Sequence, residues 1–221
     1  MIESPHYTPE HEIVRQGVRG FIELECVPHR EKWQKALKVD RGLWTKAGEA
    51  GLLCTKVDPR FGGAGGDLYH CLIVMEEQTR ACFNELAFYL HSDIIAPYIE
   101  FYGTDVQRER YLPRMVTGEI TSAIAMTEPG AGSDLQAIRT RARREGDHYI
   151  LDGAKTFISN AQLADIILVA AKTDPEVGGR GVSLLILETA GAEGFELGRN
   201  LRKIGCKAQD TSELFFDGVR I

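Results

Sequence analysis

The period of the apolar pattern changes near Glu119, and this change limits the possible folds more than any other feature. Before it, apolar residues recur at helical spacing, as at Val14 and Val18. After it, short runs rich in Ile, Val, Thr and Phe are separated by Gly, Asp and Asn, which is typical of antiparallel strands. The sequence therefore predicts an α+β multidomain protein, with an all-α helical domain at 1–119 followed by an antiparallel β-barrel or sandwich at 120–221.

Start and stop signals place the expected helices. Thr8 can cap a helix that opens with Pro9, and Val27-Pro28 is expected to end it. Thr104 and Gln107 have the spacing of a capping box, which predicts a further helix start. Pro113 lies inside that helix and is expected to kink it, while the glycine-rich stretch 59–67 is predicted to be a loop. The other helices are expected at 43–50, 68–82 and 85–102.

In the second half, turns are predicted at Glu145-Gly146-Asp147 and at Asp152-Gly153. Many short strands between such turns favour a barrel or a sandwich. The strands are expected at 120–126, 138–144, 148–151, 156–159, 166–172, 182–188, 195–201 and 212–216.

Composition excludes several classes of function. A net charge of −6 would repel a phosphate backbone, so nucleic acid is not an expected partner. No apolar stretch approaches the roughly 20 residues of a membrane span, and the N-terminus resembles neither a signal nor a transit peptide. The five cysteines lack CxxC spacing, which favours reduced thiols, and the histidines lack HxxxH spacing, so no metal site is expected. These features favour a cytoplasmic protein, or a mitochondrial matrix protein after processing.

The segment AIAMTEPGAGSD, residues 123–134, joins an apolar strand to a glycine-rich turn. Gly130 and Gly132 are expected to adopt backbone angles closed to other residues and to let a planar ligand approach the main chain. The alternative is a tight turn whose Thr, Ser and Asp side chains satisfy nearby backbone groups. The segment lacks the third glycine of a dinucleotide-binding fingerprint and is not a GK[ST] phosphate loop, so both nucleotide interpretations fail.

TEPGAGSD, followed downstream by KTFISNAQLAD (155–165), resembles the paired flavin-side motifs of the acyl-CoA dehydrogenase family. HSDIIAPYIEFYGT (91–104), RYLPRMVTGE (110–119) and GCKAQDTSELFFDGVRI (205–221) resemble the same family, in order and at the expected distances. The resemblance covers most of the chain. The FISN and KAQDT segments are most similar to the long-chain and related branches.

The resemblance implies a helical domain, a middle β-domain and a C-terminal four-helix domain, with FAD held between the last two. That third domain is absent from the 221 residues. The family performs α,β-dehydrogenation of an acyl-CoA to the trans-2-enoyl thioester, as in fatty acid β-oxidation. An electron-transferring flavoprotein is the implied acceptor, and the full-length protein is expected to be a homo-oligomer.

Site residues are carried over by position. Thr127, with its neighbours, is expected to contact the flavin pyrimidine, and Ser133 to touch both FAD and the pantetheine of the substrate. The hydroxyl of Ser159 is expected near flavin N5. Many family members have Trp and Thr at positions 157 and 159, and an aromatic residue at 124. These differences can alter how the protein stacks on the flavin and the reduction potential of the flavin. The expected cofactor-binding residues are Ile124, Ala125, Met126, Thr127, Gly132, Ser133, Phe157, Ile158 and Ser159.

The resemblance places the catalytic Glu beyond residue 221, so no catalytic residue is assigned. Glu128 and Asp134 are interpreted as carboxylates that brace the turn. The chain alone is expected to be inactive. Two alternatives remain open: an acyl-CoA oxidase or related flavin hydroxylase, and a catalytically empty chain that binds acyl-CoA or a partner.

Overall fold

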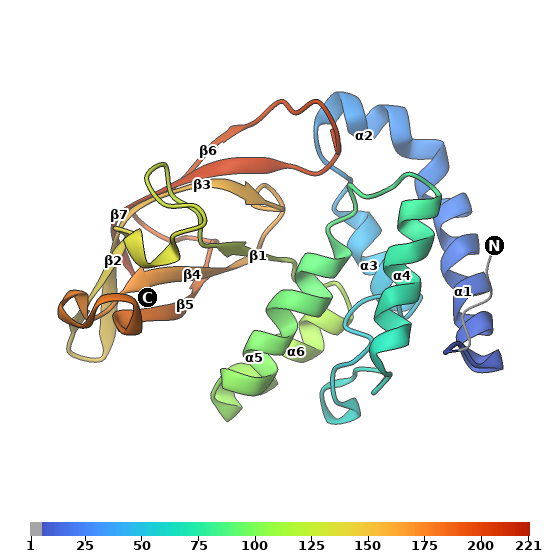
Figure 1. Ribbon diagram of the computed structural model, residues 1–221, viewed down its shortest axis with the longest axis horizontal. Helices are drawn as coiled ribbons and strands as arrows, with labels where there is room; N and C mark the ends of the chain where they lie inside the picture. The colour runs from blue at the N-terminus through green and yellow to red at the C-terminus, as the bar shows by residue number, and fades with distance from the viewer. Residues whose placement is uncertain (1–5) are drawn as a thin grey trace. The chain divides into compact units, whose positions relative to one another are not determined.

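The computed structural model describes residues 6–221, and these divide into two compact units (Figure 1). One contains the described residues up to 120 together with 203–209, and the other contains 121–202 and 210–221. No helix among the described residues has the length and apolar character needed to cross a bilayer. A helical region followed by a β-domain is the order that the sequence predicts.

The helical unit is built around buried aromatic side chains, among them Trp33, Trp44 and Phe88. Two predicted helix starts are confirmed: Thr8 caps the first helix, and Thr104 forms a capping box with Gln107. The helices are α1 (Pro9–Phe21), α2 (Arg30–Ala36), α3 (Gly42–Glu49), α4 (Leu68–Arg80), α5 (Ala96–Tyr102) and α6 (Asp105–Val116).

The prediction that Val27-Pro28 ends the first helical segment is wrong. A π-helical turn at Ile22–Cys26 and a 3₁₀ turn at Val27–His29 carry the chain directly into α2, which was not predicted. The N–H of Val27 donates to the carbonyl of Ile22, five residues back, just before the proline that has no N–H to donate. The wider turn lets the helical path continue past Pro28.

The helix predicted from residue 85 begins later, at Phe88, and a π-helical turn at Leu90–Ile95 leads into α5. Cys82 has a left-handed backbone with φ of 56°, and the N–H of Leu86 donates to the carbonyl of Phe83 in a turn. Residues 81–86 are therefore turns rather than helix. Pro113 lies within α6, which continues to Val116.

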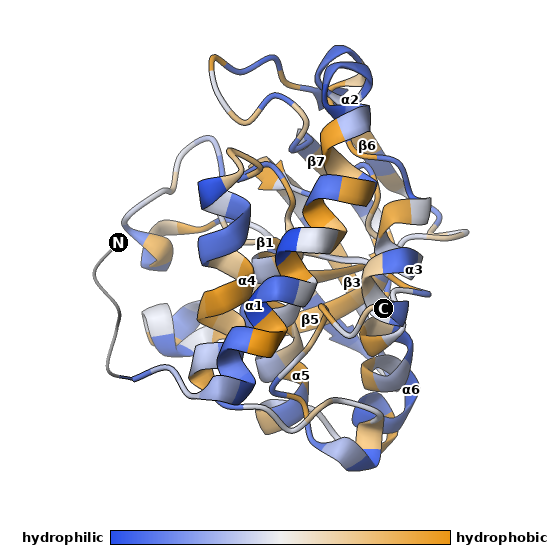
Figure 2. Cartoon of the chain, turned by 90° about the vertical axis from the view of Figure 1, so that its right-hand side faces the viewer, coloured by the Kyte–Doolittle hydropathy of each residue, from blue (hydrophilic) through white to orange (hydrophobic). Residues whose placement is uncertain are grey.

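Helices α1 and α4 lie side by side, and both carry alternating hydrophobic and hydrophilic stretches (Figures 1 and 2). On the polar side, Arg15 and Arg19 of α1 both donate to the buried carboxylate of Glu77 on α4. Arg15 also pairs with Glu76, 2.8 Å away. Glu76 and Glu77 are thus occupied in holding two helices together.

In the β unit, the described strands form one mixed sheet of order β1-β4-β2-β3-β7-β6, with β5 paired to β4. The expectation of a wholly antiparallel sheet needs correction, because β1 runs parallel to β4 and β2 meets β4 in one parallel pair. The first strand in sequence, β1, pairs with β4, which is not the next strand along the chain. The strands are β1 (Ser122–Ala125), β2 (Arg141–Glu145), β3 (His148–Ser159), β4 (Ile166–Lys172), β5 (Val182–Glu188), β6 (Phe195–Asn200) and β7 (Thr211–Arg220).

The turn predicted at Asp152-Gly153 is wrong, whereas Gly146 and Asp147 do form the turn between β2 and β3. Residues 148–159 are a single strand, and the extra residue lies on β7, where two residues oppose the one residue of β3 between Leu151 and Gly153. The carboxylate of Asp152 accepts a hydrogen bond from the N–H of Gly218 in that irregularity. An Asp-Gly pair that is typical of turns here accommodates a bulge in the neighbouring strand.

Candidate functional site

The turn after β1 is closed by two backbone hydrogen bonds. The N–H of Glu128 donates to the carbonyl of Ala131 over 2.9 Å, and the N–H of Ala131 donates back over 3.1 Å. Gly130 and Gly132 are exposed, and neither has a positive φ, so the prediction of special backbone angles is wrong. A Cβ on either would meet no atom within 4 Å. The main chain at both positions is therefore open to close approach by a ligand.

Glu128 lies beneath this turn and accepts three hydrogen bonds. The N–H groups of Arg139 and Thr140 donate to its carboxylate over 2.6 and 2.9 Å, and the Nζ of Lys155 donates over 2.9 Å. Burial acts to raise the pKa of Glu128, but the hydrogen bonds from Thr140, Arg139 and Lys155 outweigh it and lower the pKa. Glu128 therefore braces the turn as a carboxylate. Asp134 caps a 3₁₀ turn by accepting from the N–H of Gln136.

Lys155 is the residue of this site that the sequence analysis did not single out. Its side chain is 0% exposed, and Nζ donates to the carbonyl of Met126 as well as to Glu128. Burial lowers the pKa of Lys155, and Glu128 partly offsets that effect. The only available signal was a lysine within a predicted strand region, because such a side chain enters a protein interior only with a charged partner.

Strand β3 bulges where it passes the turn. Lys155 pairs with Leu214 and Ile158 with Ser212, so β3 contains one residue more than β7 over this stretch. The extra residue leaves Phe157 with a left-handed φ of 59° and a side chain that is 65% exposed. An aromatic ring held out to solvent from a strained bulge is typical of a ligand-contacting position. Ile158, in contrast, packs in the core of the β unit.

Two contacts bring the turn and the bulge together, and a third joins the start of β1 to the residue after β3. The N–H of Thr156 donates to the carbonyl of Thr127 over 2.9 Å, next to the hydrogen bond from Lys155 to Met126. At the end of β3, the amide of Asn160 donates to the carbonyl of Ser122 over 2.8 Å. The two segments that the sequence analysis paired are therefore neighbours in space.

The expected cofactor-binding residues differ in what they expose. Ala125 is buried in the same core as Ile158, so neither side chain is accessible. Gly132 and Ser133 are exposed within the turn. Four others are half-buried on β1, at the start of the turn and at the end of β3: Ile124, Met126, Thr127 and Ser159.

Comparison with known proteins decides the family. The model of the acyl-CoA dehydrogenase N-terminal domain matches residues 8–119, and that of the acyl-CoA dehydrogenase middle domain matches 123–219. The chain belongs to the acyl-CoA dehydrogenase family. It is 49% identical over 217 residues to the mitochondrial long-chain specific acyl-CoA dehydrogenase of Sus scrofa, covering 97% of this chain and 50% of that relative.

Solved acyl-CoA dehydrogenase structures share the fold over nearly all of the chain. The enzyme from Geobacillus kaustophilus superposes with a TM-score of 0.95 at 45% identity, over 99% of this chain and 58% of that one. Glutaryl-CoA dehydrogenase of Mycobacterium smegmatis, solved with FADH2, gives a TM-score of 0.88 at 28% identity, over 97% of this chain and 54% of that one. The chain spans about half the length of the curated relatives it matches.

The residues present fit a flavin of the kind bound in glutaryl-CoA dehydrogenase of Mycobacterium smegmatis. The turn offers exposed backbone and the hydroxyl of Ser133 without a Cβ in the way at Gly130 or Gly132. The bulge beside it offers an exposed aromatic ring. Flat heterocycles are commonly held by an aromatic face together with main-chain polar groups.

Proposed function

We propose that this chain supplies the flavin-side surface, and part of the acyl-side surface, of an enzyme that oxidises an acyl-CoA thioester to the trans-2-enoyl thioester. Family membership supports this proposal, and the hydrogen bond between Thr156 and Thr127 is the observation that carries it. It joins the turn at 127–133 to the end of β3, where the bulge between Lys155 and Ile158 exposes Phe157, so that both can contact one planar ligand.

FAD, when bound, supplies the acceptor for the hydride that leaves the β-carbon of the substrate. The residues of this chain bind and orient it. We assign the main-chain contacts to Ala125 and Ile158, because their side chains are buried. The polar groups of Thr127, Ser133 and Ser159, with the backbone of Gly132, would hydrogen-bond the ring and the pyrophosphate side. Phe157 would cover the ring, and Ile124 and Met126 would complete its apolar border.

Ser133 is also our candidate for the pantetheine contact, because its exposed position within the turn leaves it accessible to a second ligand. Exclusion of water around the reacting carbons then depends on the exposed ring of Phe157 and on protein outside these residues. None of the described carboxylates is assigned as the base that removes the α-proton. Glu128 already accepts from three donors, and Asp134 caps a 3₁₀ turn.

The substrate and the electron acceptor are further proposals. The 48–49% identity to mammalian long-chain specific relatives favours a long acyl chain. A structure described as the electron-transferring flavoprotein of Acidaminococcus fermentans matches with a TM-score of 0.93 at 32% identity. We propose such a flavoprotein as the acceptor, a homo-oligomer as the assembly and either the cytoplasm or the mitochondrial matrix as the location. Stopped-flow reoxidation by air and by the flavoprotein would separate a dehydrogenase from an oxidase.

Titration of the 221-residue chain with FAD, followed by visible absorption, tests the proposed binding surface. Phe157→Ala should weaken binding at least about tenfold, the effect of losing about 1.4 kcal/mol. Phe101→Ala is the matched control, because Phe101 is a similarly exposed phenylalanine of the helical unit, at 72%. Equal FAD affinity in the two variants, or no FAD binding to the chain, would refute the proposed surface.

A further inference from the structure

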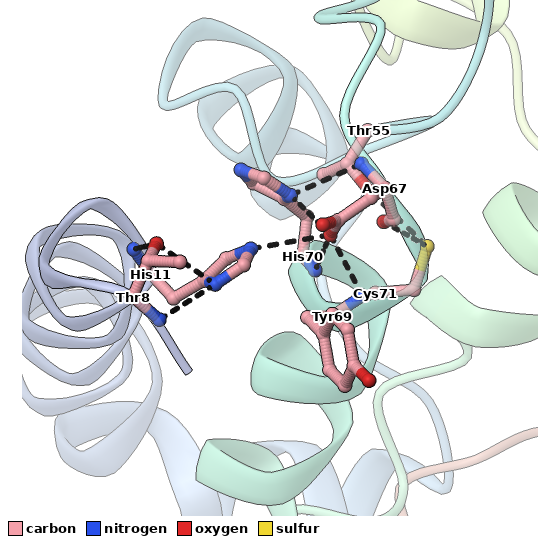
Figure 3. Close-up of polar contacts among 7 residues, drawn as sticks. All are labelled: Thr8, His11, Thr55, Asp67, Tyr69, His70 and Cys71. Carbon is pink, nitrogen blue, oxygen red and sulfur yellow. Dashed lines mark hydrogen bonds and ion pairs between the residues drawn. The ribbon is translucent and has the colours of Figure 1, made fainter. Parts of the chain in front are cut away.

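Three side chains that can ligate metals meet at the N-terminal ends of α1 and α4. The Nε2 of His11 lies 3.2 Å from one carboxylate oxygen of Asp67, and the Nδ1 of His70 lies 2.8 Å from the same oxygen. Both rings point to that carboxylate in Figure 3, and their centroids are 4.7 Å apart. One ligand atom from each residue lies within 4.8 Å of the others. Histidine spacing did not predict this cluster, because His11 is 56 residues from Asp67 in sequence.

We propose that His11, Asp67 and His70 bind one divalent transition metal ion, with Zn²⁺ as the best match. Two imidazole nitrogens and one carboxylate oxygen are zinc ligands at about 2.0–2.2 Å, which places ligand atoms about 3.4 Å apart around a tetrahedral ion. The nitrogen to oxygen separation from His11, 3.2 Å, is close to that value, whereas that from His70, 2.8 Å, would have to widen on binding. Mg²⁺ and Ca²⁺ prefer all-oxygen sites. The three protein ligands leave a fourth position for water.

The surroundings orient both rings toward the site. The Nδ1 of His11 accepts from the N–H of Thr8 in a capping box, which directs Nε2 at Asp67. When a metal takes Nε2, the ring proton moves to Nδ1, which gives up the hydrogen bond from the Thr8 N–H and can donate to the hydroxyl oxygen of Thr8, 3.1 Å away. Such a hydrogen bond to the second ring nitrogen is the usual support of a metal-bound histidine.

The second capping box acts differently on His70 of α4, because Nδ1 is both its capping atom and its proposed ligand atom. Its Nδ1 accepts from the N–H of Asp67 over 3.1 Å, so the lone pair that would bind a metal is used by that N–H. A metal would replace that bond and leave the Asp67 N–H to water, because Asp67 is exposed. The side chains of His11 and His70 are only 6% and 17% exposed, whereas that of Asp67 is 53% exposed. An ion can therefore enter from the side of Asp67.

The positive ends of two helices disfavour a cation at this place, which is why the ligand set needs the carboxylate. The consequence of binding is mechanical. A bound ion would connect α1 to α4 at their N-terminal ends, in addition to the ion pairs of Arg15 and Arg19 with Glu77. We therefore expect the ion to raise the melting temperature rather than to take part in flavin chemistry.

Calorimetric titration of the 221-residue chain with Zn²⁺ alone tests the proposal, with Co²⁺ absorption as a reporter of the ligands. His11→Gln and His70→Gln remove an imidazole but keep a residue that is usual at the third position of a capping box. The matched control is His148→Gln, because His148 pairs with Asp147 over 2.9 Å without a second imidazole. One equivalent of Zn²⁺ should bind, with a rise in melting temperature of about 5 °C at a hundredfold excess over Kd.

Both site variants should lose at least about tenfold in Zn²⁺ affinity, while the control keeps the unchanged value. Equal affinity in all four proteins, or a Co²⁺ spectrum with thiolate bands from the exposed Cys82 or Cys206, would overturn the site. A second measurement needs no variant. Zn²⁺ must shift the imidazole NMR signals of His11 and His70 but not those of His148, and unshifted signals at His11 and His70 would also overturn it.

Discussion

Lys155 and Glu128 form a buried ion pair, with 2.9 Å between Nζ and Oε1, that connects the strand carrying Phe157 to the turn carrying Ser133. The same Nζ also donates to the carbonyl of Met126. One buried cation thus holds the first residues of the turn on both sides of Thr127. The flavin-side surface that we propose depends on this pair, because the turn and the bulge are otherwise joined through single backbone contacts.

Removal of one member of the pair should destabilise the protein strongly. Glu128→Gln leaves a buried ammonium without its counter-charge, and we expect a loss of about 3 kcal/mol in the free energy of unfolding. Lys155→Met should cost a similar amount, because it leaves the carboxylate buried. The double variant should lose clearly less than the sum, as measured by denaturant unfolding of all four proteins. Additive losses would show that the two groups do not stabilise each other.

The lowered pKa of Glu128 predicts how stability depends on pH. Its carboxylate contributes fully above the unfolded carboxyl pKa of about 4.3, and the contribution is lost as pH falls through the lower folded pKa. Between pH 7 and pH 3, the unchanged chain should therefore lose more stability than the Glu128→Gln, Lys155→Met double variant, in which the other carboxylates are the same. Parallel stability curves for the two proteins would contradict this assignment.

We expect the side chain of Phe157 to strengthen FAD binding although its backbone conformation is strained. Its left-handed backbone suits glycine, so Phe157→Gly is expected to keep the free energy of unfolding or raise it by up to about 1 kcal/mol. The same change should weaken FAD binding, since the exposed ring is removed. Phe157→Trp is the matched variant that retains an aromatic face. A glycine variant that unfolds easily but binds FAD normally would assign Phe157 a structural role instead.

Gly153 allows a close approach that no other residue permits. It has φ of 146°, and a Cβ there would lie 2.6 Å from the Oγ1 and 2.7 Å from the Cα of Thr140. Gly153→Ala should cost about 2 kcal/mol or more in unfolding free energy. Gly130→Ala is the control, because its Cβ would meet no atom within 4 Å and its φ is not positive. Equal stabilities of the two alanine variants would be evidence against the β3 backbone described here.

Local signals predicted the fold where they act over a few residues. The capping residues Thr8 and Thr104 each satisfy N–H groups within their own first turn, so sequence spacing was sufficient. Parallel pairing of β1 with β4 joins residues more than 40 positions apart and leaves no short-range pattern. The Asp152-Gly153 pair was misleading for the same reason. It lies opposite a bulge whose extra residue is on β7, a strand distant in sequence.

In the candidate site too, short-range features were predicted and long-range contacts were not. The motifs located the turn and the strand segment, because the residues of each are contiguous in sequence. The ion pair of Glu128 with Lys155 was not predicted, since only the sheet brings position 155 beneath position 128. The left-handed bulge at Phe157 was also not predicted, because it arises from a register shift against β7 rather than from a glycine.

The most direct test of the central claim is a map of backbone amide NMR shifts in the 221-residue chain as FAD is added. Even weak binding would be visible at millimolar ligand. We predict that the shifted signals cluster at 127–133 and 157–159 and leave the distant end of β3 near His148 unchanged. Shifts confined to other segments, or no shift at the highest soluble FAD concentration, would contradict a flavin surface built from the turn and the bulge.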